Sequence, residues 1–303
     1  MVGSPTMKCN SCGYRFVQRK TQKIEMLFRS EEWFWKYISE GYSVRQIAEL
    51  SGKPEHFVRS DIRNRLDTNE IHCIDEVFQN VRYLMIDGYA LPWWEILLVY
   101  RAYNLWKTVW FSIAEKEGKD AIIRDLRILM DSFWYNIEAF VVDGWPSILA
   151  AIREVYPKAT IQRCLVHVQR QVFNYVSRNP KTEAGKDLVR IMNYSVLSDP
   201  SAFSRLFEEW KEKHFLFLIE KSVSYLGRRI FTHTSLRKAM RHIGNALPNM
   251  YHFASNPEIE KSTNKLEWFF WVLTEEWILE HKWLSRKRLR SFVALWIYFR
   301  NNR

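Results

Sequence analysis

Cysteine is scarce in this 303-residue chain, which has only Cys9, Cys12, Cys73 and Cys164. Four cysteines spaced so widely do not suit the disulfide framework of a small secreted domain. The first residues, MVGSPTMKCNSCGYRF, also lack the apolar stretch of a signal peptide. We therefore expect a cytoplasmic protein.

Long uninterrupted apolar runs are absent as well. The most apolar stretch, residues 90–113, is broken by Glu95, Arg101 and Lys107. Charges at that interval are costly inside a lipid bilayer, so we interpret the stretch as strands and expect no membrane partner.

Acidic residues are too few to balance the basic ones. The chain has 34 Asp and Glu against 45 Lys and Arg, which gives a net charge of +11. Hydrophobic residues make up 47% and aromatic residues 16%, enough for a sizeable core. A well-packed chain with this excess of positive charge indicates a polyanionic partner, and nucleic acid is a stronger candidate than a membrane surface.

The N-terminal 20 residues contain half of a zinc-binding pattern. Cys9 and Cys12 have the spacing of one half of a zinc ribbon, in which two thiolates bind the same metal. A second Cys-x-x-Cys does not follow, and the candidates to complete the site (Cys73, His72 and His56) are distant in sequence. A partial ribbon with Zn²⁺ and a pair of free thiols are both compatible with this segment.

Residues 28–70 carry the pattern of three short helices. Ser30 begins the first, the second runs from Ser43 to Gly52, and the third covers residues 54–66. This order predicts a helix-turn-helix whose third helix presents Arg59, Arg63 and Arg65 to the major groove of DNA. A small helical subdomain with a solvated basic face is the alternative.

From about Val81 the pattern alternates between strands and helices. We predict strands over residues 81–89, 94–104, 105–117, 137–144 and 159–167, with helices over 119–133 and 145–157. In the usual arrangement for this order the first and fourth strands are neighbours. We also expect the strand over 159–167 to pair beside the first.

Two aspartates end the first and fourth of these strands, each followed by glycine. Asp87 and Asp143 are 56 residues apart in sequence and would meet at one edge of the sheet. Two adjacent carboxylates repel unless a cation neutralises them, and their oxygens suit Mg²⁺ or Mn²⁺. Asp-Gly at the end of a strand is also common turn chemistry, so each pair alone is weak evidence.

A third carboxylate is available in the helix predicted within residues 259–284. Ser262 or Thr263 can cap this helix, and Glu267 lies in its first turns, 124 residues after Asp143. An exposed helical glutamate is the alternative interpretation of Glu267.

These motifs together resemble those of bacterial insertion-sequence transposases of the Mutator superfamily. The resemblance rests on Asp87-Gly88, on Val142-Asp143-Gly144 with its following helix, on Arg163-Cys164-x-x-His167, and on Thr263-Asn264-x-x-Glu267. It covers about residues 81–299. Asp143, Cys164 and His167 carry its most specific part.

The resemblance implies an α/β fold, a ribonuclease H-like mixed sheet with flanking helices. The catalytic domain would span residues 80–303, with an all-helical insertion at about 170–258. Asp87, Asp143 and Glu267 would form a DDE triad that binds Mg²⁺ or Mn²⁺. Cys164, His167 and Asn264 would lie beside it, in structural support or in contact with DNA.

The function implied is that of a DNA transposase. It would bind insertion-sequence ends as a homodimer or higher oligomer and catalyse cleavage and transfer of strands of double-stranded DNA. Arg286, Lys287 and Arg288 of the basic stretch 281–292 would neutralise phosphates. A ribonuclease H-like nuclease without strand transfer, and a non-catalytic DNA-binding regulator, are the alternatives.

Overall fold

The computed structural model describes residues 6–8, 15–17, 31–68, 77–115, 118–195, 200–278 and 284–301. The chain forms two compact units. The first joins Met1–His72 with Leu273–Arg303, and the second is Cys73–Val272. The C-terminal helix therefore clusters with the N-terminal helices.

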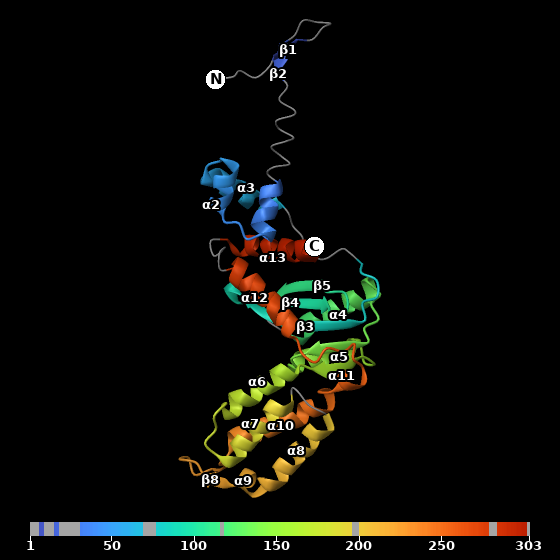
Figure 1. Cartoon of the computed structure of the whole chain (residues 1–303), viewed down its shortest axis with the longest axis vertical. Coiled ribbons are helices and arrows are strands. Elements are labelled where there is room, and N and C mark those ends of the chain that lie inside the picture. The colour runs from blue at the N-terminus through green and yellow to red at the C-terminus, as the bar shows by residue number, and fades with distance from the viewer. Residues whose placement is uncertain are drawn as a thin grey trace. The chain divides into compact units, whose positions relative to one another are not determined.

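The second unit contains a five-stranded mixed sheet (Figure 1). Its strands are β3 (Tyr83–Leu91), β4 (Glu95–Ala102), β5 (Lys107–Ala114), β6 (Ala139–Val142) and β7 (Thr160–Arg163). They lie in the order β5-β4-β3-β6-β7. The pairs β3–β4 and β4–β5 are antiparallel, whereas β3–β6 and β6–β7 are parallel. The predicted order of elements is confirmed, and the first and fourth strands are neighbours.

One face of the sheet packs against two helices, α4 (Lys119–Arg127) and α5 (Pro146–Val155). Side chains alternate between the faces of a strand, so every second residue reaches this core. The buried residues of β3, β4 and β6 that share the core with the two helices are Leu84, Ile86, Leu98, Tyr100, Ala102, Phe140 and Val142.

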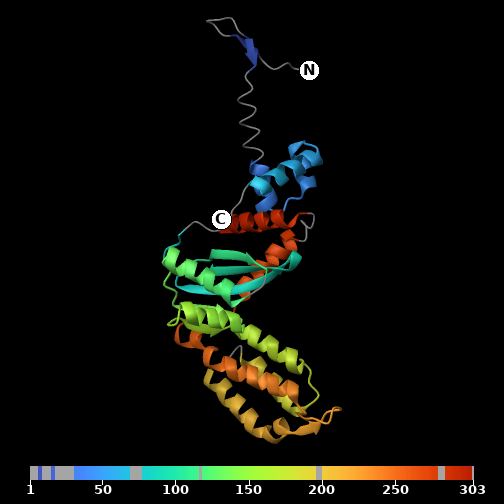
Figure 2. The same ribbon diagram turned by 180° about the vertical axis from the view of Figure 1, so that it is seen from behind.

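The other face of the sheet is covered by α12 (Asn264–Trp271). The Tyr89 ring of β3 stacks on Phe270 of this helix, with ring centroids 5.3 Å apart. Figures 1 and 2 show α12 crossing one side of the sheet and α4 lying on the other. By the alternation of the strand, Asp87 and Tyr89 share the α12 side.

The helix predicted over residues 119–133 changes type along its length. α4 ends at Arg127 and continues as a π-helix, η2 (Ile128–Ser132). The N–H of Phe133 donates to the carbonyl of Ile128 (3.3 Å), the five-residue spacing of a π-helix. α12 likewise continues as a π-helix, η4 (Val272–Ile278).

The strand predicted over residues 159–167 is shorter than expected. β7 ends at Arg163, and α6 (Leu165–Val176) begins after Cys164, whose carbonyl accepts from the N–H of Val168 (3.0 Å). β7 also pairs with β6 and not with the strand that carries Asp87, contrary to our expectation. His167 consequently lies in the first turn of a helix.

The part of the second unit after α6 is mainly helical. Its core includes apolar residues such as Leu188, Phe203 and Ile243, and Val168 of α6 packs in the same core. Its further helices are α7 (Glu183–Ser195), α8 (Pro200–Lys213), α9 (Phe215–Ile219), α10 (Thr234–Ala246), α11 (His252–Ser255) and the 3₁₀-helix η3 (Leu247–Asn249).

The prediction that this part is all-helical is wrong. β8 (Lys221–Val223) and β9 (Arg229–Phe231) form an antiparallel hairpin. The turn between them depends on Gly227, whose φ of +73° is in the left-handed region that favours glycine. A 3₁₀-helix, η1 (Pro92–Trp94), similarly separates β3 from β4.

The first unit contains the three predicted helices, over residues 31–39, α2 (Val44–Ser51) and α3 (Glu55–Thr68). Ser43 begins α2 with a capping box, and Gly52 ends it in the left-handed conformation, as predicted. α13 (Arg286–Asn301) packs in the same unit, where the ring of Trp35 contacts that of Phe299.

The N-terminal strands β1 (Thr6–Lys8) and β2 (Arg15–Val17) pair antiparallel. Cys9 and Cys12 lie outside the described residues, as do His72 and Cys73 of the proposed zinc site. Among the described helices, none is both long and apolar enough to cross a membrane.

Candidate active site

Asp87 lies in β3 directly after the parallel pairing with β6 stops. The last paired residues are Ile86 and Val142, so Asp87 and Asp143 occupy the next position on adjacent strands. β3 does not end here as predicted, because its antiparallel pairing with β4 continues to Leu91. One carboxylate oxygen of Asp87 accepts from the N–H of Gly88 (2.9 Å).

Asp143 is held in a tight turn between β6 and α5. Its Oδ1 accepts from the N–H of Trp145 (3.0 Å), and its carbonyl accepts from the guanidinium of Arg163 (3.1 Å). Gly144 has a φ of +90°, and a Cβ at this position would come within 1.8 Å of Arg163 Nε. The glycine is therefore required both by the turn and by the arginine packed beneath it.

The carboxyl group of Asp143 is partly desolvated. Burial raises its pKa above the ordinary range, although the Trp145 N–H and the charges of His167 and Arg163 act against this shift. Asp143 makes no ion pair with any residue in the described part of the chain. A cation would stabilise the charged form of such a carboxylate.

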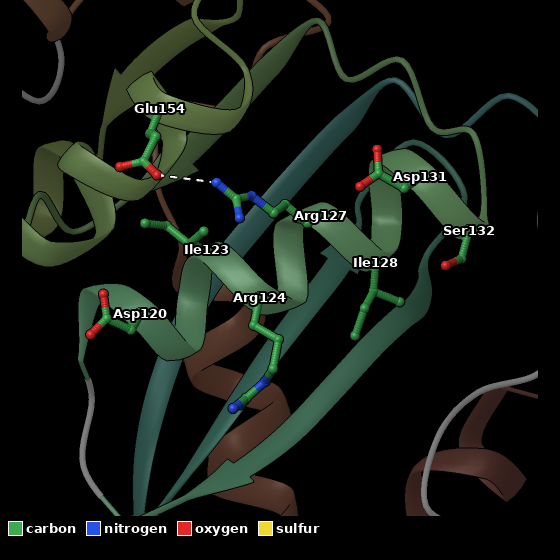
Figure 3. Close-up of a pocket in the computed structure, with 8 residues that line it drawn as sticks. All are labelled: Asp120, Ile123, Arg124, Arg127, Ile128, Asp131, Ser132 and Glu154. Carbon is green, nitrogen blue, oxygen red and sulfur yellow. Dashed lines mark hydrogen bonds and ion pairs between the residues drawn. The ribbon is translucent and has the colours of Figure 1, made fainter.

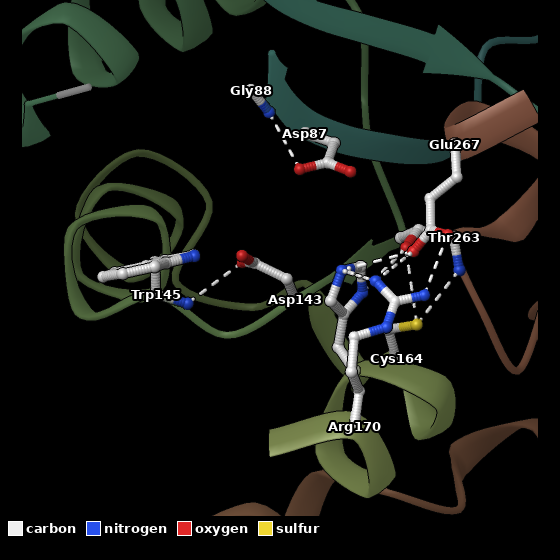
Figure 4. Close-up of polar contacts among 9 residues, drawn as sticks. Asp87, Gly88, Asp143, Trp145, Cys164, Arg170, Thr263 and Glu267 are labelled. Carbon is white, nitrogen blue, oxygen red and sulfur yellow. Dashed lines mark hydrogen bonds and ion pairs between the residues drawn. The ribbon is translucent and has the colours of Figure 1, made fainter. Parts of the chain in front are cut away.

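Cys164, Thr263 and His167 form a hydrogen-bonded cluster, and Figure 4 shows the contact between Cys164 and Thr263. The buried Cys164 Sγ accepts from both the N–H and the Oγ1–H of Thr263, each at 3.3 Å. Thr263 has one hydroxyl hydrogen, so the Nδ1–H of His167 donates to Thr263 Oγ1 (3.2 Å). Thr263 precedes α12, but its side chain does not cap the helix, because this cluster engages it.

The same cluster places α12 against α6. The N–H of Leu165 donates to the carbonyl of Lys261 (3.1 Å), which together with the Thr263–Cys164 bonds joins the start of one helix to the start of the other. As a result Glu267, one turn into α12, faces His167 and Arg170 of α6.

Arg170 binds Glu267 in a bidentate ion pair. Its two terminal nitrogens donate to Oε1 and Oε2 of Glu267 at 3.2 and 3.1 Å. His167 Nε2 also lies 3.3 Å from Glu267 Oε1. Arg170 was not among the predicted site residues, although it follows His167 by three residues and so shares its face of α6.

Cys164 and His167 each shift the pKa of the other. Burial alone would raise the pKa of the Cys164 thiol, but the nearby His167 and the hydrogen bonds from Thr263 lower it. Burial alone would lower the pKa of His167, but Cys164 and the charges of Asp87 and Glu267 raise it. The neighbouring carboxylates therefore favour the protonated form of His167.

The structure brings the three candidate carboxylates to one side of the sheet. In Figure 4, Asp87 and Asp143 lie near each other, the Asp143 carboxylate is turned toward Trp145, and the Glu267 carboxylate is turned toward Arg170. Within the described ranges no three His, Cys, Asp or Glu side chains lie close enough to hold a metal ion. The oxygen donors fit Mg²⁺ or Mn²⁺ chemically, but Glu267 is engaged by Arg170 in this conformation.

The other predicted site residues are Asn264 and the basic residues of α3 and α13. Asn264 is the first residue of α12, and its side chain is exposed. Arg65 of α3 pairs with Asp61 (3.0 Å), and Arg59 of α3 pairs weakly with Glu55 (3.8 Å).

α13 and α3 meet around the remaining basic residues. Arg288 of α13 forms a bidentate pair with Asp67 (2.9 and 2.8 Å), so its charge is partly neutralised within the protein. Arg63 and Arg288 line one shallow pocket of the first unit, whereas Arg286 and Lys287 are exposed at the start of α13.

A separate pocket lies between α4, η2 and α5 (Figure 3). Its charged lining residues include Arg127 and Glu154, which approach to 3.4 Å. None of the three candidate carboxylates lines it. This pocket is therefore distinct from the site around Asp87, Asp143 and Glu267.

Comparison with known proteins identifies one family. The sequence model of the Mutator family of transposases matches residues 108–268, just over half of the chain. The match contains Asp143, Cys164, His167 and Glu267, whereas Asp87 precedes it. No curated protein gives a significant match.

Proposed function

We propose, from the premise that the chain belongs to the Mutator family of transposases, that it cuts and joins DNA strands at Asp87, Asp143 and Glu267. The observation that carries this proposal is the placement of Asp87 and Asp143 next to each other on neighbouring strands, with Glu267 on α12, the helix that covers this side of the sheet (Figure 4). The fold would then be ribonuclease H-like, and the strand order β5-β4-β3-β6-β7 supports this.

The three carboxylates would hold Mg²⁺ or Mn²⁺. When bound, such ions activate a water or a DNA 3′-OH for attack and stabilise the leaving oxygen. The protein's own contribution is positional. The turn at Gly144 and the buried Arg163 fix Asp143, and the Cys164–Thr263–His167 cluster fixes the start of α12.

Arg170 has a different role in this proposal. Its bidentate pair with Glu267 must open before the glutamate can reach a metal shared with the aspartates. The released guanidinium would remain beside the site, where it can neutralise a DNA phosphate.

DNA binding would involve both units. In the first, the helices over 31–68 would act as a helix-turn-helix, with Arg59 and Arg63 facing DNA, assisted by Arg286 and Lys287 at the start of α13. The net charge of +11 supports a DNA partner. A homodimer or higher oligomer would bring two transposon ends together.

The test is a cleavage assay in Mg²⁺ or Mn²⁺ on duplexes that carry the terminal sequences of the element encoding this chain. A transposase nicks these ends and joins pre-cleaved ends to a target duplex. Cleavage without joining would indicate a nuclease of related fold. DNA binding without either reaction would indicate a non-catalytic regulator.

A further inference from the structure

The β8–β9 hairpin presents an apolar tip to solvent. Tyr225 and Leu226 occupy the turn, and their side chains are 96% and 63% exposed. Val223 and Ile230 on the strands are also exposed. In Figures 1 and 2 the hairpin extends away from the neighbouring helices α7 and α9. Large apolar side chains exposed together at one point are a typical feature of interaction sites.

The hairpin is well anchored at its base, so the tip is held in place. The guanidinium of Arg237 on α10 lies 3.6 Å from the ring centre of Phe231. His233 pairs with Glu220 (2.9 Å), and the N–H of Thr232 donates to the Glu220 carbonyl (2.9 Å). These contacts fix both ends of the hairpin to the helical part of the unit.

The turn itself is ordered by three hydrogen bonds. The Ser224 N–H donates to the Arg228 carbonyl (2.8 Å), the Gly227 N–H to the Ser224 carbonyl (2.9 Å), and the Arg228 N–H to Ser224 Oγ (3.2 Å). Tyr225 and Leu226 therefore occupy the two central positions of a tight turn and project from it.

The charge on the hairpin is of one sign. Lys221, Arg228 and Arg229 are exposed and make no ion pair with any described residue. The one acidic residue nearby, Glu220, is paired with His233. Val223 and Arg229 are directly opposite in the register, so an apolar and a basic side chain share one face behind the tip.

We propose that this hairpin binds duplex DNA, with Tyr225 and Leu226 as a wedge at a base step and Arg228 and Arg229 on the flanking phosphates. The inference rests on the proposed function, since it takes DNA as the partner. Unpaired cations complement a polyanion, which favours DNA over a second protein surface. Apolar side chains inserted from the minor groove unstack base steps and kink the duplex by about 20–90°.

The experiment compares DNA binding by three double variants of the full chain. Arg228→Ala with Arg229→Ala removes the two hairpin charges, and Tyr225→Ala with Leu226→Ala removes the tip. Lys186→Ala with Arg205→Ala is the control, because it removes two exposed charges that are paired within their own helices.

Affinity for a mixed-sequence duplex is measured over about 50–200 mM salt, and DNA bending by energy transfer between dyes on its two ends. In the arginine variant, the slope of log affinity against log salt concentration should be smaller in magnitude by about 2, at about 0.9 for each lost phosphate contact. The control should keep the slope of the wild type. The tip variant should keep the slope and lose the bend.

The outcomes separate this inference from the proposed function. If the wild-type chain does not bind the duplex, the proposed function fails. If it binds, but the arginine variant matches the control and the tip variant still bends DNA, only the hairpin proposal fails. A tip variant that changes the oligomeric mass while binding and bending DNA normally would assign the hairpin to a protein interface instead.

Discussion

Replacing Arg170 with alanine should make the candidate site bind Mn²⁺ more tightly. In the structure the guanidinium holds both oxygens of Glu267, at 3.2 and 3.1 Å, and so competes with any metal for this carboxylate. The Arg170 side chain is 49% exposed and that of Glu267 31% exposed, so the pair is that of a surface salt bridge with good geometry. Such a pair contributes about 0.5–1 kcal/mol, which corresponds to about 2- to 5-fold in affinity.

The assay is a titration of the full chain with Mn²⁺, followed by calorimetry or by electron paramagnetic resonance of the free ion. Arg170→Ala should bind about 2- to 5-fold more tightly, while Arg170→Lys, which keeps the charge but not the bidentate geometry, should lie between the two. Thermal unfolding should barely change. If Arg170→Ala binds Mn²⁺ more weakly than the wild type, Arg170 supports Glu267 as a ligand and does not restrain it, and our reasoning is wrong.

Two further predictions concern stability. Cys164→Ala should lower the free energy of unfolding by about 1–3 kcal/mol, because it leaves the buried N–H and hydroxyl of Thr263 without their acceptor, while Cys164→Ser should lose less. Urea denaturation measures both, and equal losses would contradict this role for the sulfur. Burial, with a smaller contribution from the Arg163 charge, lowers the pKa of His242 from 6.5 to about 4. Only the unfolded chain then gains this proton as the pH falls from about 6.5 to about 4, so stability should decline across that window, and His242→Gln should reduce the decline. An unchanged pH profile in that variant would refute the assignment to His242.

The sheet could be predicted from the sequence because its signals are local and strong. The strands of the second unit are apolar runs separated by charged or turn residues, and the neighbouring positions of Asp87 and Asp143 follow from the order of elements. Helix α2 could be predicted equally well, because Ser43 is a typical N-terminal cap and Gly52 a typical C-terminal one.

The boundary between β7 and α6 could not be predicted with the same certainty. Residues 164–168, Cys-Leu-Val-His-Val, are apolar except for His167, and so short a segment fits a strand and a buried helix equally well. Because residues 164–167 were predicted as strand, the ion pair between Arg170 and Glu267 was not predicted. A helix that begins at Leu165 puts His167 and Arg170 on one face. The π-helical continuations of α4 and α12 have no signal of their own in the sequence.

The β8–β9 hairpin was missed for a different reason. Its strands have three residues each and pack little apolar surface against the core, so no alternating pattern of buried residues distinguishes them. The role of Thr263 could not be predicted either. A threonine before a helix predicts a cap, whereas Thr263 forms hydrogen bonds with Cys164 and His167, which lie 99 and 96 residues earlier in the chain.

The central claim is that Asp87, Asp143 and Glu267 act as one metal-dependent catalytic site. The most direct test is strand cleavage and joining in Mn²⁺ by Asp87→Asn, Asp143→Asn and Glu267→Gln, with DNA affinity measured in parallel. Each variant loses one negative charge that would offset the cations, so each should abolish both reactions and leave DNA binding nearly intact. Glu275→Gln, an exposed position in η4, should behave as the wild type. Full activity of Glu267→Gln would contradict the account and make Glu260, which pairs with Lys265, the next candidate for the third carboxylate.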